Sequence, residues 1–102
     1  MIAPNVPAAQ SRVIDLPLGR LVSTPCALDA LAKAGQSAAE FIERHRKGDW
    51  GDLVPADCEA NDRAVIDGDR ILSAYSLKDQ TKIWIITESD RSVTTLLLPD
   101  EY

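Results

Sequence analysis

Hydrophobic and polar residues alternate with a period of two over the last third of the chain. Three segments are rich in β-branched, aliphatic and aromatic side chains, as strands are: residues 70–77 (RILSAYSL), 82–87 (KIWIIT) and 93–98 (VTTLLL). The connections at residues 78–80 and 88–91 have hairpin length, and strands joined this tightly pair antiparallel. The pattern therefore predicts an antiparallel meander at the C-terminal end.

The middle strand of this meander is apolar on both faces. Ile83 and Ile85 point to one side, whereas Trp84 and Ile86 point to the other. A sheet of this kind needs two covers. We expect helices over one face and the N-terminal arm or a binding partner over the other.

A helical period of 3.6 precedes the strands. Thr24 followed by Pro25 is a helix-start signal, and Gly35 is a stop signal. Ser37 with Glu40 forms the capping-box pattern of a second helix, which ends at Gly48. A third helix is predicted from near residue 55 to residue 68.

The segment before the helices has β-forming residues interrupted by breakers. Residues 12–18 and 21–23 are separated by Pro17 and Gly19, which predicts a short edge strand or an extended arm. Residues 1–10 lack a periodic signal and are predicted to be flexible. The chain is therefore predicted to form one α+β domain over residues 11–102. Two to three N-terminal helices pack on a three- to four-stranded antiparallel meander.

Composition and charge narrow the function classes. The 102 residues are 45% hydrophobic and 26% charged, which is typical of a globular domain. No apolar run approaches the roughly 20 residues that span a bilayer, and residues 1–10 do not resemble a secretory signal, so we expect a cytoplasmic protein. The net charge of −5 argues against general binding to nucleic acid or anionic membranes.

The sequence contains no pattern for a metal or cofactor. The spacing of Cys26 and Cys58 matches no metal motif, and both are expected to be reduced. His45 is the one histidine, which argues against a structural zinc site. Glycine-rich phosphate loops and H-E-x-x-H are absent.

His45 is the residue for which a catalytic role is the main alternative to a structural one. Metal-independent RNA cleavage needs a base and donors for the phosphate, and these could come from His45 with Tyr75, Thr87 and Arg91. However, His45 is in helical phase with Phe41 near a helix end, where packing and the helix dipole also explain it. The structural interpretation is the one we favour.

Binding candidates gather in two loops. In Gly48-Asp49-Trp50-Gly51-Asp52, two glycines flank a tryptophan that is either core or an exposed interface anchor. The predicted binding residues are Trp50, Asp49, Asp52, Glu88, Asp90 and Arg91. Glu88 and Asp90, with Asp100 and Glu101, lack calcium-loop spacing and are interpreted as solvated carboxylates.

Motifs along most of the chain resemble a group of small proteins of bacterial plasmids and integrated mobile elements. They include Leu18-Gly19-Arg20, the loop at residues 48–53 (GDWGDL), residues 71–75 (ILSAY), and the ending Trp84-Ile85-Ile86-Thr87-Glu88 … Asp90-Arg91-Ser92 … Thr94-Thr95 … Leu98-Pro99 … Glu101-Tyr102. Members are usually labelled uncharacterised or plasmid-related, so the resemblance implies an origin and no chemistry. Cys26 departs from the pattern, which has a small residue such as glycine there.

The expected function is protein binding. An acidic accessory protein of a mobile element, an anti-defence or regulatory factor, would contact a host or element-encoded protein with a basic surface. The alternative rests on the order of helices followed by a meander, which is also that of RelE-like ribonuclease toxins, with His45 as the catalytic residue; a shared fold does not transfer function. A homodimer formed through an edge strand is a third possibility.

Overall fold

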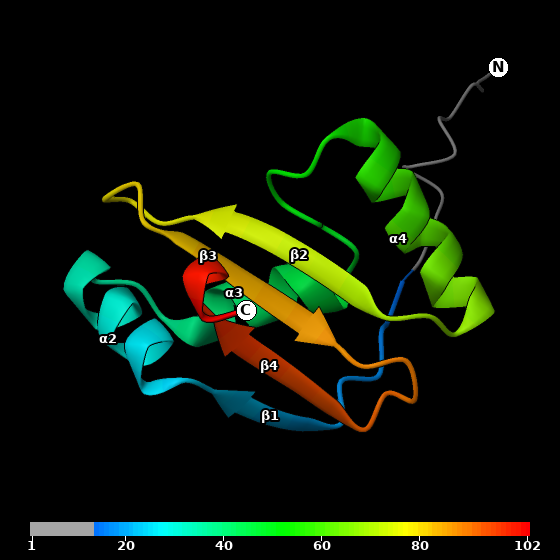
Figure 1. Cartoon of the computed structure of the whole chain (residues 1–102), viewed down its shortest axis with the longest axis horizontal. Coiled ribbons are helices and arrows are strands. Elements are labelled where there is room, and N and C mark those ends of the chain that lie inside the picture. The colour runs from blue at the N-terminus through cyan, green and yellow to red at the C-terminus, as the bar shows by residue number, and fades with distance from the viewer. Residues whose placement is uncertain (1–13) are drawn as a thin grey trace, which may run out of the picture.

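The computed structural model describes residues 14–102, in which a strand is followed by three helices, three more strands and a final 3₁₀ turn (Figure 1). The elements are β1 (Arg20–Ser23), α2 (Pro25–Ala34), α3 (Ala38–Arg46), α4 (Pro55–Asp67), β2 (Ile71–Ser76), β3 (Lys82–Thr87), β4 (Val93–Leu97) and the turn η1 (Pro99–Glu101). The predicted flexible segment, residues 1–10, and residues 12 and 13 of the predicted arm lie outside the described residues.

The helices begin where their capping residues predict. The Thr24 side chain accepts a hydrogen bond from the Ala27 N–H (3.1 Å), and Ser37 accepts one from Ala39 (3.1 Å). The reciprocal bond of the predicted capping box is missing, because the Glu40 carboxylate accepts from the Gln36 amide instead (3.4 Å). Serine capping alone is sufficient to start α3.

The sheet has the strand order β1-β4-β3-β2. The predicted meander is confirmed, because β2, β3 and β4 pair antiparallel in sequence order. The fourth strand, however, pairs parallel with β4, from Arg20 opposite Val93 to Ser23 opposite Leu96, so the sheet is mixed and not wholly antiparallel. Three helices and two strands separate β1 from β4, and a connection of that length can return in either direction.

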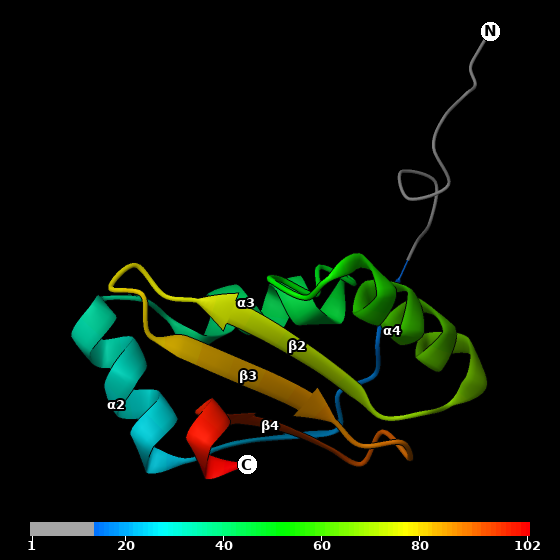
Figure 2. The same cartoon turned by 45° about the horizontal axis from the view of Figure 1, so that its top comes forward.

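One face of the sheet, here called the back face, holds the main core. Its side chains come from alternate residues of β2, β3 and β4, and Ser73, Tyr75, Ile83, Ile85 and Leu96 are all buried. α2 and α3 lie against this face and add Ala27, Leu31 and Phe41 to the same cluster (Figure 2). The predicted helical cover is therefore present.

A second cluster joins the N-terminal arm to α4. It consists of Leu16, Trp50, Ala64 and Ile71, and the Leu16 N–H donates to the Arg46 carbonyl at the end of α3 (3.0 Å). Because the arm packs with the helices on the back-face side, the prediction that it covers the opposite face is wrong for residues 14–18. Burial of Leu16 fixes its position.

The outer edge of β2 is closed by the loop that follows α3. The Ala74 N–H donates to the Trp50 carbonyl (3.1 Å), and the Asp52 N–H donates to the Ala74 carbonyl (2.7 Å), so the loop forms a parallel bridge at Gly51. Beyond it, α4 lies along β2 (Figure 1) and its Asn61 side chain donates to the Leu72 carbonyl (2.8 Å). This edge is therefore not available for pairing with another strand.

The opposite face of the sheet, called the front face, is formed by Leu72, Ala74, Trp84, Ile86, Thr95 and Leu97. Among the described residues, η1 and Tyr102 lie across it (Figures 1 and 2). The Tyr102 ring meets Trp84 edge-on at 5.6 Å between centroids. Leu72, Ala74, Trp84 and Thr95 are nevertheless only half-buried, so the second cover is incomplete.

Candidate functional site

His45 lies in the core between α3 and the back face. Its side chain has 0% exposure, and both ring nitrogens have hydrogen-bond partners. Nδ1 lies 2.6 Å from the Ser73 hydroxyl on β2, and Nε2 lies 2.8 Å from the Thr87 hydroxyl on β3. Trp50 closes a third side of the ring, with its indole edge-on at 5.8 Å.

The direction of each hydrogen bond in this network follows from counting protons. Thr94 uses its one hydroxyl proton to donate to the Leu18 carbonyl (2.8 Å), so the 2.7 Å contact between the two threonines requires Thr87 to be the donor. Thr87 must then accept from His45, which places the ring proton on Nε2. Nδ1 is left as an acceptor for the Ser73 hydroxyl. We use the name hydroxyl relay for this set of five groups, which are Ser73, His45, Thr87, Thr94 and the Leu18 carbonyl.

The environment of His45 keeps the imidazole neutral. Burial, and to a smaller extent the positive charge of Arg91, together lower its pKa from the ordinary 6.5 to about 4. A neutral ring does not offset the helix dipole as a cation, so that part of the structural interpretation is wrong. The ring has no exposed atom through which it could reach a substrate.

The other residues of the ribonuclease alternative are not arranged around an opening. Tyr75 is buried, donates its hydroxyl proton to the Asp49 carbonyl (2.7 Å), and has a raised pKa because of burial. Thr87 contacts His45, but inside the core. The guanidinium of Arg91 donates to the carbonyls of Asp69 (2.7 Å) and Ala64 (2.9 Å). These side chains stabilise the fold, and no cleft exposes them together.

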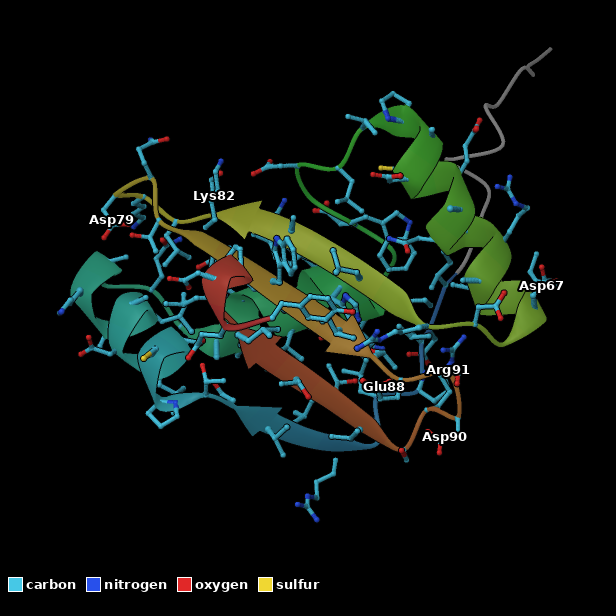
Figure 3. The ribbon with its side chains drawn as sticks, viewed as in Figure 1. Asp67, Asp79, Lys82, Glu88, Asp90 and Arg91 are labelled. Carbon is cyan, nitrogen blue, oxygen red and sulfur yellow. The ribbon has the colours of Figure 1, made fainter. Side chains whose placement is uncertain are left out.

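The predicted binding residues Glu88, Asp90 and Arg91 lie together at the end of the sheet where β3 passes to β4 (Figure 3). Glu88 pairs with Arg70 (3.4 Å), and Asp90 accepts from the Ser92 backbone and hydroxyl (3.0 and 2.6 Å). Arg91 has a φ of 61° and fastens this turn to α4. Three of the six predicted binding residues are therefore neighbours. Asp90 stabilises the turn itself, whereas Glu88 and Arg91 connect it to Arg70 and to α4.

The remaining predicted residues form the loop after α3, and they have different roles. Trp50 is only 3% exposed and donates its indole proton to Asp62 (2.9 Å), so it is core and not an exposed anchor. The positive φ of Gly51 turns the chain so that the ring points inward. Asp49 pairs with Arg44 (2.7 Å), and Asp52 accepts from the Ser76 hydroxyl (2.7 Å).

The front face presents apolar residues that are not among the six predicted binding residues. Leu72, Ala74 and Trp84 contribute apolar side chains from two adjacent strands, and all three are half-buried. The signal in the sequence was the apolar alternation on both sides of the middle strand. It indicated a second face but did not identify the strand residues of β2 that share it with Trp84.

A hollow of about 540 Å³ lies between α2 and the turn that joins β2 to β3. It is lined by Pro25, Cys26, Asp29, Ala30, Lys33, Asp79, Thr81 and Leu98. The Glu101 carboxylate raises the pKa of the exposed Cys26 thiol, so this cysteine is not activated as a nucleophile. The residues that line this hollow therefore do not include an activated nucleophile.

Residues 14–102 contain neither a grouped set of metal ligands nor a membrane-spanning helix. No group of three or more histidine, cysteine, aspartate or glutamate side chains in residues 14–102 is placed to hold a metal ion. None of the helices described here has the length and apolar character that crossing a bilayer requires.

Comparison of the chain with protein-family models, with curated proteins and with solved structures found no match.

Proposed function

We propose that this chain is a cytoplasmic protein-binding domain of mobile-element origin that acts without catalysing a reaction. Its partner is a host or element-encoded protein with a basic surface, which the domain contacts through the front face. The observation that carries the proposal is the incomplete cover of an apolar sheet face with carboxylates at its borders.

The apolar part of this face has the character of an interface core. Trp84 is half-buried and stands at the centre of the three-stranded meander, with Ala74 opposite it on β2 and Leu97 opposite it on β4. Tryptophan is enriched among the residues that dominate binding energy, particularly where neighbours already exclude water. Tyr102, which is 65% exposed, extends the aromatic surface outward.

Charge at the borders supports a basic partner. Asp52 and Asp57 lie beside the outer edge of β2, and Asp100 follows β4; none of these three carboxylates forms an ion pair within residues 14–102. Of the basic residues nearby, Arg70 pairs with Glu88, and Lys82 donates to the Ser76 hydroxyl (2.6 Å), which in turn donates to Asp52. Because the chain has a net charge of −5, it would attract a basic surface over about one Debye length.

The resemblance to plasmid and mobile-element proteins gives this binding a biological setting. A basic partner surface in a bacterial cell is commonly one that holds nucleic acid. An acidic domain that covers such a surface would act as an anti-defence or regulatory factor, which is the role we propose.

The test is capture of a partner by immobilised protein in three forms. The wild type and Ile66→Ser should retain the same stoichiometric protein from host extract, and Trp84→Ser should lose it. Ile66 is 84% exposed on α4 and lies outside the front face, so it controls for loss of an exposed apolar side chain. The retained protein should dissociate as salt is raised. Equal capture by all three forms, or none, would overturn the proposal.

A further inference from the structure

A small hollow between α4 and β2 adjoins the front face. Its volume is about 260 Å³, and it is lined by Leu53, Asp57, Ala60, Asn61 and Leu72. Ligand pockets for whole metabolites are typically about 300–1,000 Å³, so this hollow has the size for one side chain. Leu72 belongs to both the hollow and the front face, which makes the two surfaces continuous.

Asn61 places a hydrogen-bond acceptor in the hollow. Its side chain is 7% exposed, and its Nδ2 donates to the Leu72 carbonyl (2.8 Å), which fixes the orientation of the amide. Its Oδ1 accepts no hydrogen bond from residues 14–102. In that same part of the chain no fully buried side-chain oxygen lacks a partner, so Oδ1 retains accessible surface, and the hollow is a space that Asn61 lines. An amide oxygen held in this way is available for a donor from outside.

Asp57 places a second acceptor at the rim. It lies in the first turn of α4, is exposed, and pairs with no cation within the described residues. The remaining walls, from Leu53, Ala60 and Leu72, are apolar. The hollow thus combines a neutral acceptor, an anionic acceptor and apolar walls. It fits a cationic donor on an aliphatic stem and disfavours an anion.

We propose that this hollow takes an arginine side chain of the basic partner. The methylene stem packs between Leu53 and Leu72, and the planar guanidinium, with five donors, serves the Asn61 oxygen and the Asp57 carboxylate at once. A lysine ammonium fits less well because it lacks the planar fork that reaches two separated acceptors. The assignment rests on the proposed function, since it names the group by which the partner is recognised.

The test uses N-acetyl-arginine methylamide as a probe in a heteronuclear NMR titration of the full chain. We expect saturable shifts at Leu53, Leu72 and the Asn61 side-chain amide. The neutral and nearly isosteric citrulline analogue should bind about three- to fivefold more weakly, which is the scale of an exposed ion pair. The lysine analogue should also bind more weakly than arginine.

Variants on one helix distinguish the hollow from general attraction to acidic surface. Asp57→Asn should weaken binding of the arginine probe by a similar factor of about three to five. Glu59 is an exposed carboxylate of α4 that does not line the hollow, so Glu59→Gln should leave the affinity for the probe unchanged. Equal loss in both variants, shifts scattered over other carboxylates, or equal binding of the citrulline analogue would each overturn the assignment.

Failure of this assignment is separable from failure of the proposed function. If the captured partner binds Asp57→Asn with wild-type affinity but is lost by Trp84→Ser, the front face is correct and the arginine assignment is wrong. If the probe binds as expected but no partner depends on Trp84, the hollow is correct and the proposed function is wrong.

Discussion

At the scale of single residues, the hydroxyl relay explains why polar groups occupy the centre of this small core. Ser73, His45, Thr87 and Thr94 connect α3 to three strands, and the last proton reaches the Leu18 carbonyl in the N-terminal arm. Every donor has one acceptor, so burial leaves no group unpaired. The relay therefore specifies how α3 and the arm dock on the sheet.

The neutral state of His45 predicts a pH-dependent stability. Its pKa is about 4 in the folded chain and near 6.5 when unfolded, so between these values the unfolded state binds more protons. Stability is full above pH 6.5 and falls as the pH drops toward 4. The loss is about 3 kcal/mol, because each pKa unit corresponds to about 1.4 kcal/mol. Urea unfolding followed by tryptophan fluorescence at several pH values measures it.

His45→Gln is the control for this prediction. The variant should be less stable at pH 7 and should lack the slope between about pH 6.5 and 5.5, where ordinary carboxylates are already largely ionised. The same slope in both proteins would show that another group is responsible.

Thr94 should contribute more to the free energy of unfolding than Thr95, which points to the front face. Thr94→Val preserves shape but removes the acceptor for Thr87 and the donor for Leu18, which should cost about 1–3 kcal/mol. Thr95→Val, half-buried on the front face, should change stability by less than about 0.5 kcal/mol. Chemical denaturation of both variants makes the comparison, and equal effects would contradict the relay.

At the scale of elements, the closed edge of β2 depends on one glycine. Gly51 has a φ of 78°, and a Cβ at this position would lie 1.9 Å from the Ala74 carbonyl oxygen that accepts the Asp52 N–H. The loop can approach β2 closely only without a side chain there. The bridge at Gly51 also holds Trp50 in the core.

Gly51→Ala should destabilise the chain by more than about 3 kcal/mol, because the clash adds to the cost of the positive φ. Gly35→Ala is the matched control, since Gly35 has a φ of 69° but nothing within 4 Å of a Cβ. It should lose only about 1–2 kcal/mol. Thermal unfolding of the two variants compares them, and equal losses would show that the close approach to the Ala74 carbonyl adds nothing to the cost.

The helices and the meander could be predicted because their signals are local. Thr24, Ser37 and the glycines at the helix ends fixed boundaries within one or two residues, and period-two alternation fixed the three strands. The parallel pairing of β1 was not predictable in this way, because it joins residues about 70 positions apart. Spacing along the helix does not fix the ion pairs either: Arg44 pairs with Asp49 in the following loop and not with Glu40, which lies one helical turn earlier.

The candidate site was predictable only in outline, because its residues are brought together by contacts between segments that are far apart in the sequence. The alternation around Trp84 indicated a second apolar face, and the helix signals placed Asp57 and Asn61 on one predicted helix. Which residues of β2 share that face, and that Asn61 and Asp57 line one hollow, depends on tertiary packing. The glycines around Trp50 suggested an exposed loop, but pairing with β2 turned the indole inward.

At the scale of the whole molecule, the acidic balance predicts no direct binding to nucleic acid. Affinity for phosphates depends on clustered arginine and lysine. In residues 14–102, Arg44, Arg46 and Lys47 are each paired with a carboxylate. Single-stranded RNA at physiological salt should therefore neither bind nor be cleaved, as measured by a gel-shift and cleavage assay. Cleavage lost in His45→Ala would favour the ribonuclease alternative.

The front face as a protein-binding surface is tested most directly by mapping the captured partner onto the chain by heteronuclear NMR. If the partner binds there, the Trp84 indole and the amides of Leu72, Ala74 and Thr95 should shift or broaden. The amides of Ala39 and Glu43, on the solvent side of α3, should stay unchanged. Changes confined to α3, with the Trp84 indole unmoved, would contradict binding at the front face.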